Sequence, residues 1–227
     1  THSWTAIVED NADRVYIGHD TSFDGFPSAC DLIATAKRLD DRGKLFSLVA
    51  PPLMENEMIR LRDCLDTLSN RVNAFEVVCN DWGLLEWLTQ SKAATPVLGR
   101  FLTGQATDPR LAALDWPGVQ IPHERLVPHA DGTHVNLRYR PPSAALVEHV
   151  QCCAIDTPPV LNMLWQMGVH RLELSNSLQG ATLAENLGWR VSLHLPEVPI
   201  AVLPHSITDG QHLWRHPSFP VPLVIRH

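Results

Sequence analysis

The sequence lacks the features that mark several large classes of protein. No apolar stretch approaches the roughly 18 residues of a membrane-spanning helix, so we expect no membrane span. The net charge is −7 and no basic run occurs, which argues against nucleic acid as a partner. The sequence also contains no nucleophile elbow, no phosphate-binding loop, no dinucleotide-binding fingerprint and no paired-histidine zinc motif. None of these motif-defined enzyme classes is therefore indicated.

Cysteine is scarce, and its spacing matches no metal site. The five cysteines are Cys30, Cys64, Cys79, Cys152 and Cys153. An odd number without a Cys-x-x-Cys pair is typical of reduced thiols, so we expect a cytoplasmic protein. A strand is predicted over 152–155, which would place the side chains of Cys152 and Cys153 on opposite faces. The five thiols are then too dispersed to hold an iron–sulfur cluster, and we expect neither a metal nor another cofactor.

What the sequence does contain is a repeated order of buried strand and amphipathic helix. Continuous apolar runs, as opposed to alternating ones, are typical of parallel strands covered on both faces. Five such runs end in a polar or glycine-bearing tip, at residues 15–20, 45–49, 75–81, 96–100 and 170–175. Further strands are expected at 152–155 and 190–195, and helices at 27–39, 55–68, 81–88, 159–167 and 177–187.

This alternation predicts one α/β domain with parallel strands. A chain of 227 residues is long enough for a TIM-like βα barrel, complete or incomplete, whose strand tips share one rim. The alternation is interrupted at about 103–145, a stretch that contains prolines and glycines but shows no clear amphipathic helix. We therefore expect a long irregular insertion there and an irregular tail at about 196–227.

Two strand tips carry side chains suited to a small anionic ligand. Asn80 and Asp81 lie at a strand-to-helix corner, where they either face a ligand cleft or cap the helix. Arg100 ends the next strand, and a guanidinium there can bind a carboxylate or phosphate through two points. Asp108 and Arg110 follow in the insertion. The alternative is structural, with an ion pair of Arg100 with Asp108, or of Arg110 with Asp81, that fixes the insertion.

Two more residues are candidates for acid–base chemistry. His19 lies at the first rim position beside Asp20. It is either a general acid, a base or a metal ligand together with His194 or Asp81, or a loop histidine without such a role. Glu173 lies inside a strand and points opposite to its two leucine neighbours. It is therefore either a buried acid inside the barrel or part of an edge or interface strand.

Four stretches of the sequence, taken together, carry a family resemblance. They are 13–18 (DRVYIG), 78–85 (VCNDWGLL), 167–175 (MGVHRLELS) and 191–200 (VSLHLPEVPI). In combination they resemble the peptidase U32 family, the collagenase-like peptidases, which also includes accessory proteins of oxygen-independent ubiquinone hydroxylation. The resemblance implies a TIM-like barrel, in agreement with the strand pattern.

The sequence also departs from that family at two functional positions. Residues 176–178 read Asn-Ser-Leu where the family often has Arg-Glu-Leu, so its acidic residue is absent. The cysteine segment that holds an iron–sulfur cluster in some members would fall near 203–207, yet no cysteine follows Cys153. The resemblance thus implies an accessory or binding subunit of a larger assembly. The alternative is an enzyme, a hydrolase or hydroxylation factor, with a rim site around Asp81 and Arg100.

The insertion and the tail are predicted to form a contact surface for another protein chain or for an oligomer. A loop of about 40 residues is entropically costly to order unless something packs on it. The competing interpretation is a lid that folds over the rim. Aromatic and arginine side chains of the kind enriched in interface cores occur in both segments, at Trp116, Arg138, Tyr139, Arg140 and Trp214.

Overall fold

The computed structural model describes residues 12–105, 124–128, 130–138, 143–176, 182 and 188–194. The expected helix over 177–187 lies outside the described residues apart from Thr182, and the tail over 196–227 lies wholly outside them. In chain order the elements are β1 (Arg14–Gly18), α1 (Ala29–Asp40), β2 (Leu45–Ala50), α2 (Glu55–Ser69), β3 (Glu76–Cys79), α3 (Trp82–Ser91), β4 (Thr95–Leu98), β5 (Glu124–Pro128), β6 (His134–Arg138), α5 (Ala144–Gln151), α6 (Pro158–Gln166), β7 (Arg171–Ser175) and β8 (Arg190–His194).

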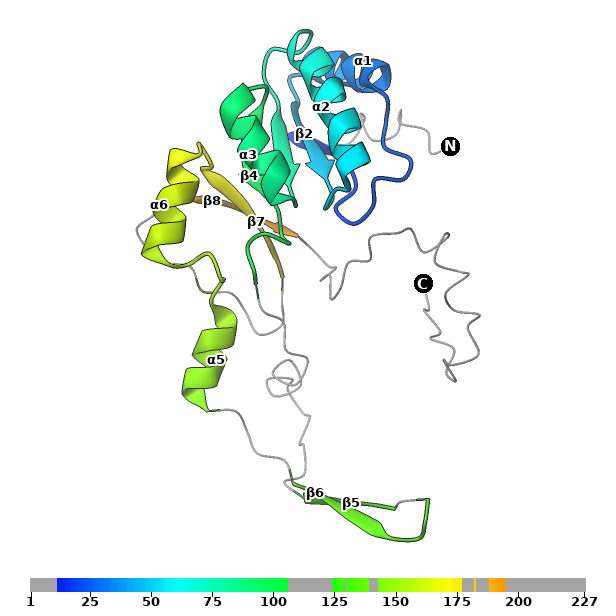
Figure 1. The fold of residues 1–227 in the computed structure, drawn as a ribbon, viewed down its shortest axis with the longest axis vertical. Helices are drawn as coiled ribbons and strands as arrows, with labels where there is room; N and C mark the ends of the chain where they lie inside the picture. Colours follow the sequence, from blue (N-terminus) through cyan, green and yellow to red (C-terminus); the bar gives the residue numbers. More distant parts are fainter. Residues whose placement is uncertain are drawn as a thin grey trace.

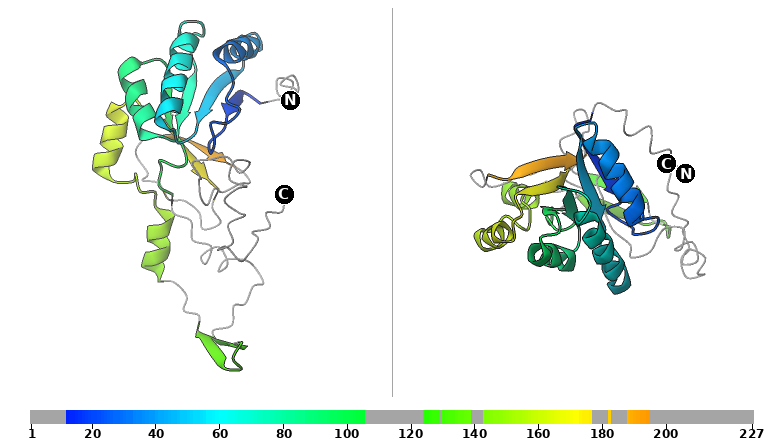
Figure 2. Two further views of the ribbon diagram at one scale, coloured as in Figure 1. Left: turned by 45° about the vertical axis from the view of Figure 1, so that its right-hand side comes forward. Right: turned by 90° about the horizontal axis from the view of Figure 1, so that it is seen from above.

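Six of the strands form one parallel sheet in the order β1-β2-β3-β4-β7-β8. The sheet curls into a half-barrel, with β1 and β8 as its edges in the described part of the chain (Figures 1 and 2). Leu98, the last residue of β4, pairs with Leu172 of β7, so Glu173 lies one residue beyond the end of β4. The predicted α/β fold with parallel strands is confirmed, and the half-barrel is compatible with an incomplete barrel.

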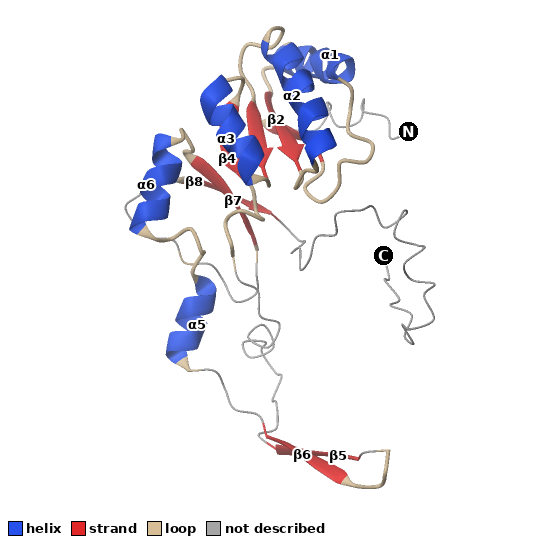
Figure 3. Ribbon diagram, viewed as in Figure 1, coloured by secondary structure: helices blue, strands red, loops and turns tan. Residues whose placement is uncertain are grey.

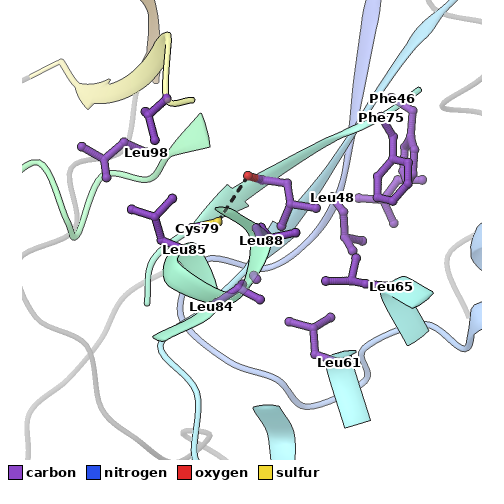
Figure 4. Close-up of a cluster of buried hydrophobic side chains, with 14 of the residues drawn as sticks. Phe46, Leu48, Leu61, Leu65, Phe75, Cys79, Leu84, Leu85, Leu88 and Leu98 are labelled. Atoms are coloured by element: carbon purple, nitrogen blue, oxygen red, sulfur yellow. Dashed lines mark hydrogen bonds between the residues drawn. The ribbon is translucent and has the colours of Figure 1, made fainter. Parts of the chain in front are cut away.

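Helices α1, α2, α3 and α6 cover the convex face of this sheet, as the colouring by secondary structure shows (Figure 3). Each helix buries one apolar stripe against the strands, as α1 does with Leu32, Ala36 and Leu39. The central part of this core is drawn in Figure 4, where leucines of α2 and α3 pack on phenylalanine and leucine side chains of the strands. Burial of this apolar surface is the main stabilising term of the domain.

The helices begin where the sequence supplies caps. The Ser28 side chain accepts a hydrogen bond from the backbone N–H of Asp31 at 3.2 Å and starts α1. The Glu57 carboxylate accepts from the backbone N–H of Met54 at 2.8 Å, which is half of a capping box for α2. A proline at the first position, Pro158, fixes the backbone at the start of α6. These local signals explain why the predicted starts of the helices match the observed ones to within a few residues.

The insertion is only partly irregular. Its described part contains an antiparallel hairpin of β5 and β6, followed by α5, and both stand away from the sheet in Figure 1. The strand expected at 152–155 is wrong, because α5 runs to Gln151 and only isolated bridges follow, Gln105 with Cys153 and Cys152 with Thr182. The apolar residues before Cys152 have helical spacing, and this decides the local structure.

The helices of the described residues include none that is long and apolar enough to cross a membrane.

Candidate functional site

The concave face of the half-barrel, called here the inner face, carries polar and charged side chains. Strand alternation places Val15 and Ile17 of β1 in the core beneath the helices and Tyr16 on the inner face. The parallel register aligns Tyr16 with Ser47 of β2, and Ser47 with Glu76 of β3. A small apolar cluster of the aligned residues Val49, Val78 and Val97 is separate from the main core.

An ion-pair network centred on Glu76 crosses the inner face. The Glu76 carboxylate pairs with Arg14 and accepts a hydrogen bond from the Ser47 hydroxyl at 3.1 Å. It also accepts one from Arg171 at 2.5 Å. The Arg171 guanidinium further donates to the Tyr16 hydroxyl at 2.7 Å and to the Ser192 hydroxyl at 2.5 Å. Arg171 of β7 thereby links both edge strands, β1 and β8, to β3 through its own side chain.

Arg171 remains protonated in this network. Burial by itself would lower the pKa of the guanidinium, but the hydrogen bond to Tyr16 and the charges of Glu76 and Glu173 outweigh it and raise the pKa. The side chain of Arg171 is 9% exposed and that of Glu76 is 14% exposed, so the pair is largely removed from water. Among the described strands, the network therefore links β1 and β3 to β7, although no backbone ladder pairs either of them with β7.

Glu173 and His194 form a second charged contact on the inner face. The Glu173 side chain is 2% exposed, and its Oε2 lies 2.8 Å from Nε2 of His194 in the edge strand β8. The other carboxylate oxygen, Oε1, is buried without a hydrogen-bond partner in the described part of the chain. Glu173 thus lies inside the curled sheet as a buried acid, and β7 is an inner strand of the sheet, not its edge.

Asn80 and Asp81, at the corner after β3, make structural bonds. The buried Asn80 amide donates to the carbonyl of Ala50 at 3.0 Å, and its oxygen accepts from the backbone N–H of Phe101 at 3.2 Å. The Asp81 carboxylate accepts from the backbone N–H of Leu84 at 3.0 Å and caps α3. Of the two interpretations of this corner, helix capping accounts for Asp81, and Asn80 ties two strand ends together.

Arg100 follows β4 at the rim, which here means the carboxyl ends of the parallel strands. Its guanidinium pairs with Asp20, beyond the end of β1, so the two tips are joined across the rim. The expected ion pairs of Arg100 with Asp108 and of Arg110 with Asp81 are not tested, because Asp108 and Arg110 lie outside the described residues. The curl of the sheet brings the tips of β1 and β4 together, which allows this ion pair of Arg100 with Asp20.

His19 lies at the rim, where it is exposed and contacts the neighbouring residues Asp20 and Thr21. Its side chain is 64% exposed and its Nδ1 lies 2.7 Å from the Thr21 hydroxyl. The nearest carboxylate that it contacts is Asp20, at 3.8 Å. Among the described residues, no group of three or more His, Cys, Asp and Glu side chains is placed to hold a metal ion. His194 is instead bound to Glu173, so the metal site considered for His19 with His194 or Asp81 is not formed there.

The cysteine thiols are free and are held in their neutral form where they are buried. Burial raises the pKa of Cys79 far above its ordinary value, and the charge of Asp81 adds to this. Burial also raises the pKa of Cys153, to about 11. Neutral thiols are poor nucleophiles and poor metal ligands, so these two cysteines are suited to packing.

The described surface includes two cavities that are lined by none of the candidate site residues. One of about 540 Å³ lies at the opposite end of the strands from the rim, among the last turns of α2, α3 and α6. The other, of about 420 Å³, lies beside α1 and is lined by Phe26, Asp31 and Arg38 among others. The rim candidates are therefore held together by mutual bonds and not arranged around one of these cavities.

The residues that sequence reasoning missed are those of the inner-face network: Arg14, Tyr16, Ser47, Glu76, Arg171 and Ser192. A signal for some of them was present in the sequence. Arg171 stands two residues before Glu173, with leucines at positions 172 and 174, so both charges face the same side of the strand. Their partners come from strands far away in the sequence, which no local pattern identifies.

No family model matches the chain, and no curated protein or solved structure matches it.

Proposed function

We propose that this chain is an accessory or binding subunit that docks on another protein chain through the hairpin of β5 and β6. The observation that carries the proposal is the isolation of this hairpin, which stands away from the sheet in Figure 1. A lone two-stranded hairpin is marginally stable in water and usually needs a surface to pack on. The Leu126 side chain on β5 is 65% exposed, and Leu146 on the adjoining α5 is 43% exposed.

The rim residues support the same proposal, because they are engaged in structural bonds. Asp81 caps a helix, Asn80 holds two strand ends, and Arg100 pairs with Asp20. An enzyme site built around Asp81 and Arg100 would need these groups to face a substrate. The alternative of a hydrolase or hydroxylation factor with that rim site is therefore the weaker one.

We also propose a more specific type for this fold. We infer that the half-barrel is an incomplete TIM-like barrel of the peptidase U32 type, one that lacks the family's acidic residue and cluster cysteines. The parallel order of the strands and the helices on the convex face support this interpretation. Such a barrel would itself be non-catalytic and would act in an assembly with its protein partner.

The docking surface is tested by native mass spectrometry of the purified protein, with identification of every co-purifying chain. We expect wild type to carry a second protein chain or a second copy. The variant Leu126→Asp should lose that partner while its thermal unfolding is unchanged. A matched control is Ile59→Asp on α2, which replaces an apolar side chain that is 56% exposed on the helical face. A monomeric wild type without co-purifying protein, or equal partner binding by all three proteins, would contradict the proposal.

A further inference from the structure

The contact between Glu173 and His194 has the geometry of a carboxylate that orients an imidazole. Glu173 Oε2 lies 2.8 Å from Nε2 of His194, and the carboxylate is almost completely buried. Since an ionised carboxylate only accepts hydrogen bonds, Nε2 carries the proton in this contact. The remaining ring nitrogen, Nδ1, is the atom at which the neutral ring accepts a proton. In the described part of the chain Nδ1 has no hydrogen-bond partner, and the side chain is 31% exposed.

A tyrosine ring that carries a hydroxyl group packs against His194. The Tyr16 ring packs edge to face on the imidazole, with 6.2 Å between ring centroids. The Tyr16 hydroxyl accepts a hydrogen bond from Arg171, so its own O–H remains available to donate. Tyr16 is 37% exposed, and both rings are therefore reachable from solvent. The charged groups that face the pair are Glu173, Arg171 and, through Arg171, Glu76.

We propose that His194, oriented by Glu173, is the proton acceptor of a site for a small ligand that carries a weakly acidic hydroxyl group. The ligand hydroxyl donates to Nδ1 of His194. In the transfer, the ligand O–H bond breaks, its electron pair stays on the ligand oxygen, and a new N–H bond forms at Nδ1. The Glu173 carboxylate stays ionised and stabilises the imidazolium, and the Tyr16 hydroxyl donates to the ligand oxyanion. This inference goes beyond the accessory role and does not depend on it.

The arrangement favours such a ligand over a metal ion or an anion. A metal would need further ligands, and the described residues offer no third one here. An anion would lie against the buried negative charge of Glu173, which opposes its binding. A neutral hydroxyl avoids both problems, because it becomes charged only as the proton reaches the imidazole. A base held by a carboxylate is the arrangement that general-base sites use.

The probe is 4-nitrophenol, whose anion absorbs visible light and whose neutral form does not. At a pH where the free phenol is mostly protonated, wild-type protein should produce the phenolate band in a saturable way. His194→Gln should abolish the band. Glu173→Gln should weaken it about tenfold, because its amide oxygen still accepts from Nε2 but carries no charge. The matched control His149→Gln, on the exposed face of α5, should behave as wild type.

Nitrogen NMR of histidine-labelled wild type tests the tautomer without any substitution. We expect His194 in the Nε2–H form, and an Nδ1–H form would overturn the proposal. An equal phenolate band in wild type and His194→Gln, or no band in wild type, would also overturn it. A band unchanged in Glu173→Gln would remove Glu173 from the site. The docking proposal is tested by native mass spectrometry of Leu126→Asp, which these measurements do not involve. Either proposal can therefore fail while the other holds.

Discussion

Arg171 acts as a clamp across the half-barrel, and its replacement by methionine should strongly destabilise the domain. The guanidinium donates to three groups at 2.5–2.7 Å, on β1, β3 and β8. Methionine keeps much of the length and packing of the side chain but makes none of these bonds. The clamp matters because β1 and β8 are the edges of the sheet, and the described residues show no backbone ladder between them.

The size of the effect follows from the burial of the pair. Removing one member of a buried ion pair commonly costs about 3–5 kcal/mol, because the remaining charge stays desolvated. Glu76 keeps Arg14 and Ser47 as partners, so we expect the lower end, about 3 kcal/mol. For a chain of this size, 1 kcal/mol corresponds to a change in Tm of roughly 2–4 °C, which predicts a fall of about 10 °C for Arg171→Met.

Urea unfolding followed by circular dichroism measures this loss, with Arg38→Met on the exposed side of α1 as the control. The double variant Arg171→Met with Glu76→Gln should recover part of the loss, since the two side chains interact directly. A loss below about 0.5 kcal/mol for Arg171→Met, no larger than that of Arg38→Met, would refute the clamp. Purely additive effects of Arg171 and Glu76 would show that the ion pair itself contributes nothing.

Three further predictions concern the rim and the core. Burial, with smaller contributions from neighbouring charges, raises the pKa of Cys153 from 9.0 to about 11. Between these pH values the unfolded chain binds fewer protons than the folded one, so the free energy of unfolding should fall as pH rises. Cys153→Ala should make this fall less steep in urea titrations at about pH 9–11. Asp81→Ala should cost about 1 kcal/mol by removing the cap of α3, whereas Asp81→Asn should cost less, both measured by thermal unfolding. Gly99→Ala should cost roughly 1–3 kcal/mol, because its Cβ would lie 2.2 Å from Asn80 Oδ1 and 2.7 Å from the Cys79 carbonyl oxygen; an unchanged Tm for Gly99→Ala would show that the strand end yields at no cost.

The periodicity of the sequence predicted the elements that rest on local physical chemistry. Continuous apolar runs located β1 to β4 and β7, because a parallel strand covered on both faces needs apolar residues in succession. Helical spacing of apolar residues located α1, α2, α3 and α6, and of the two interpretations left open for Asp81, the structure shows the helix cap. The expectation of a strand at 152–155 failed because short apolar runs do not by themselves distinguish the end of a helix from a strand.

The pairing of the inner-face side chains was decided by the tertiary structure alone. From the sequence, Glu173 was either a buried acid or part of an edge or interface strand, and its partner His194 lies on the next strand of the sheet, 21 residues away. Arg171 and Tyr16 are 155 residues apart and meet only because the sheet curls. A charge inside an apolar strand can be read from the sequence, since it violates the local pattern. The group that compensates the charge is fixed by strand order and curvature, which arise from long-range packing.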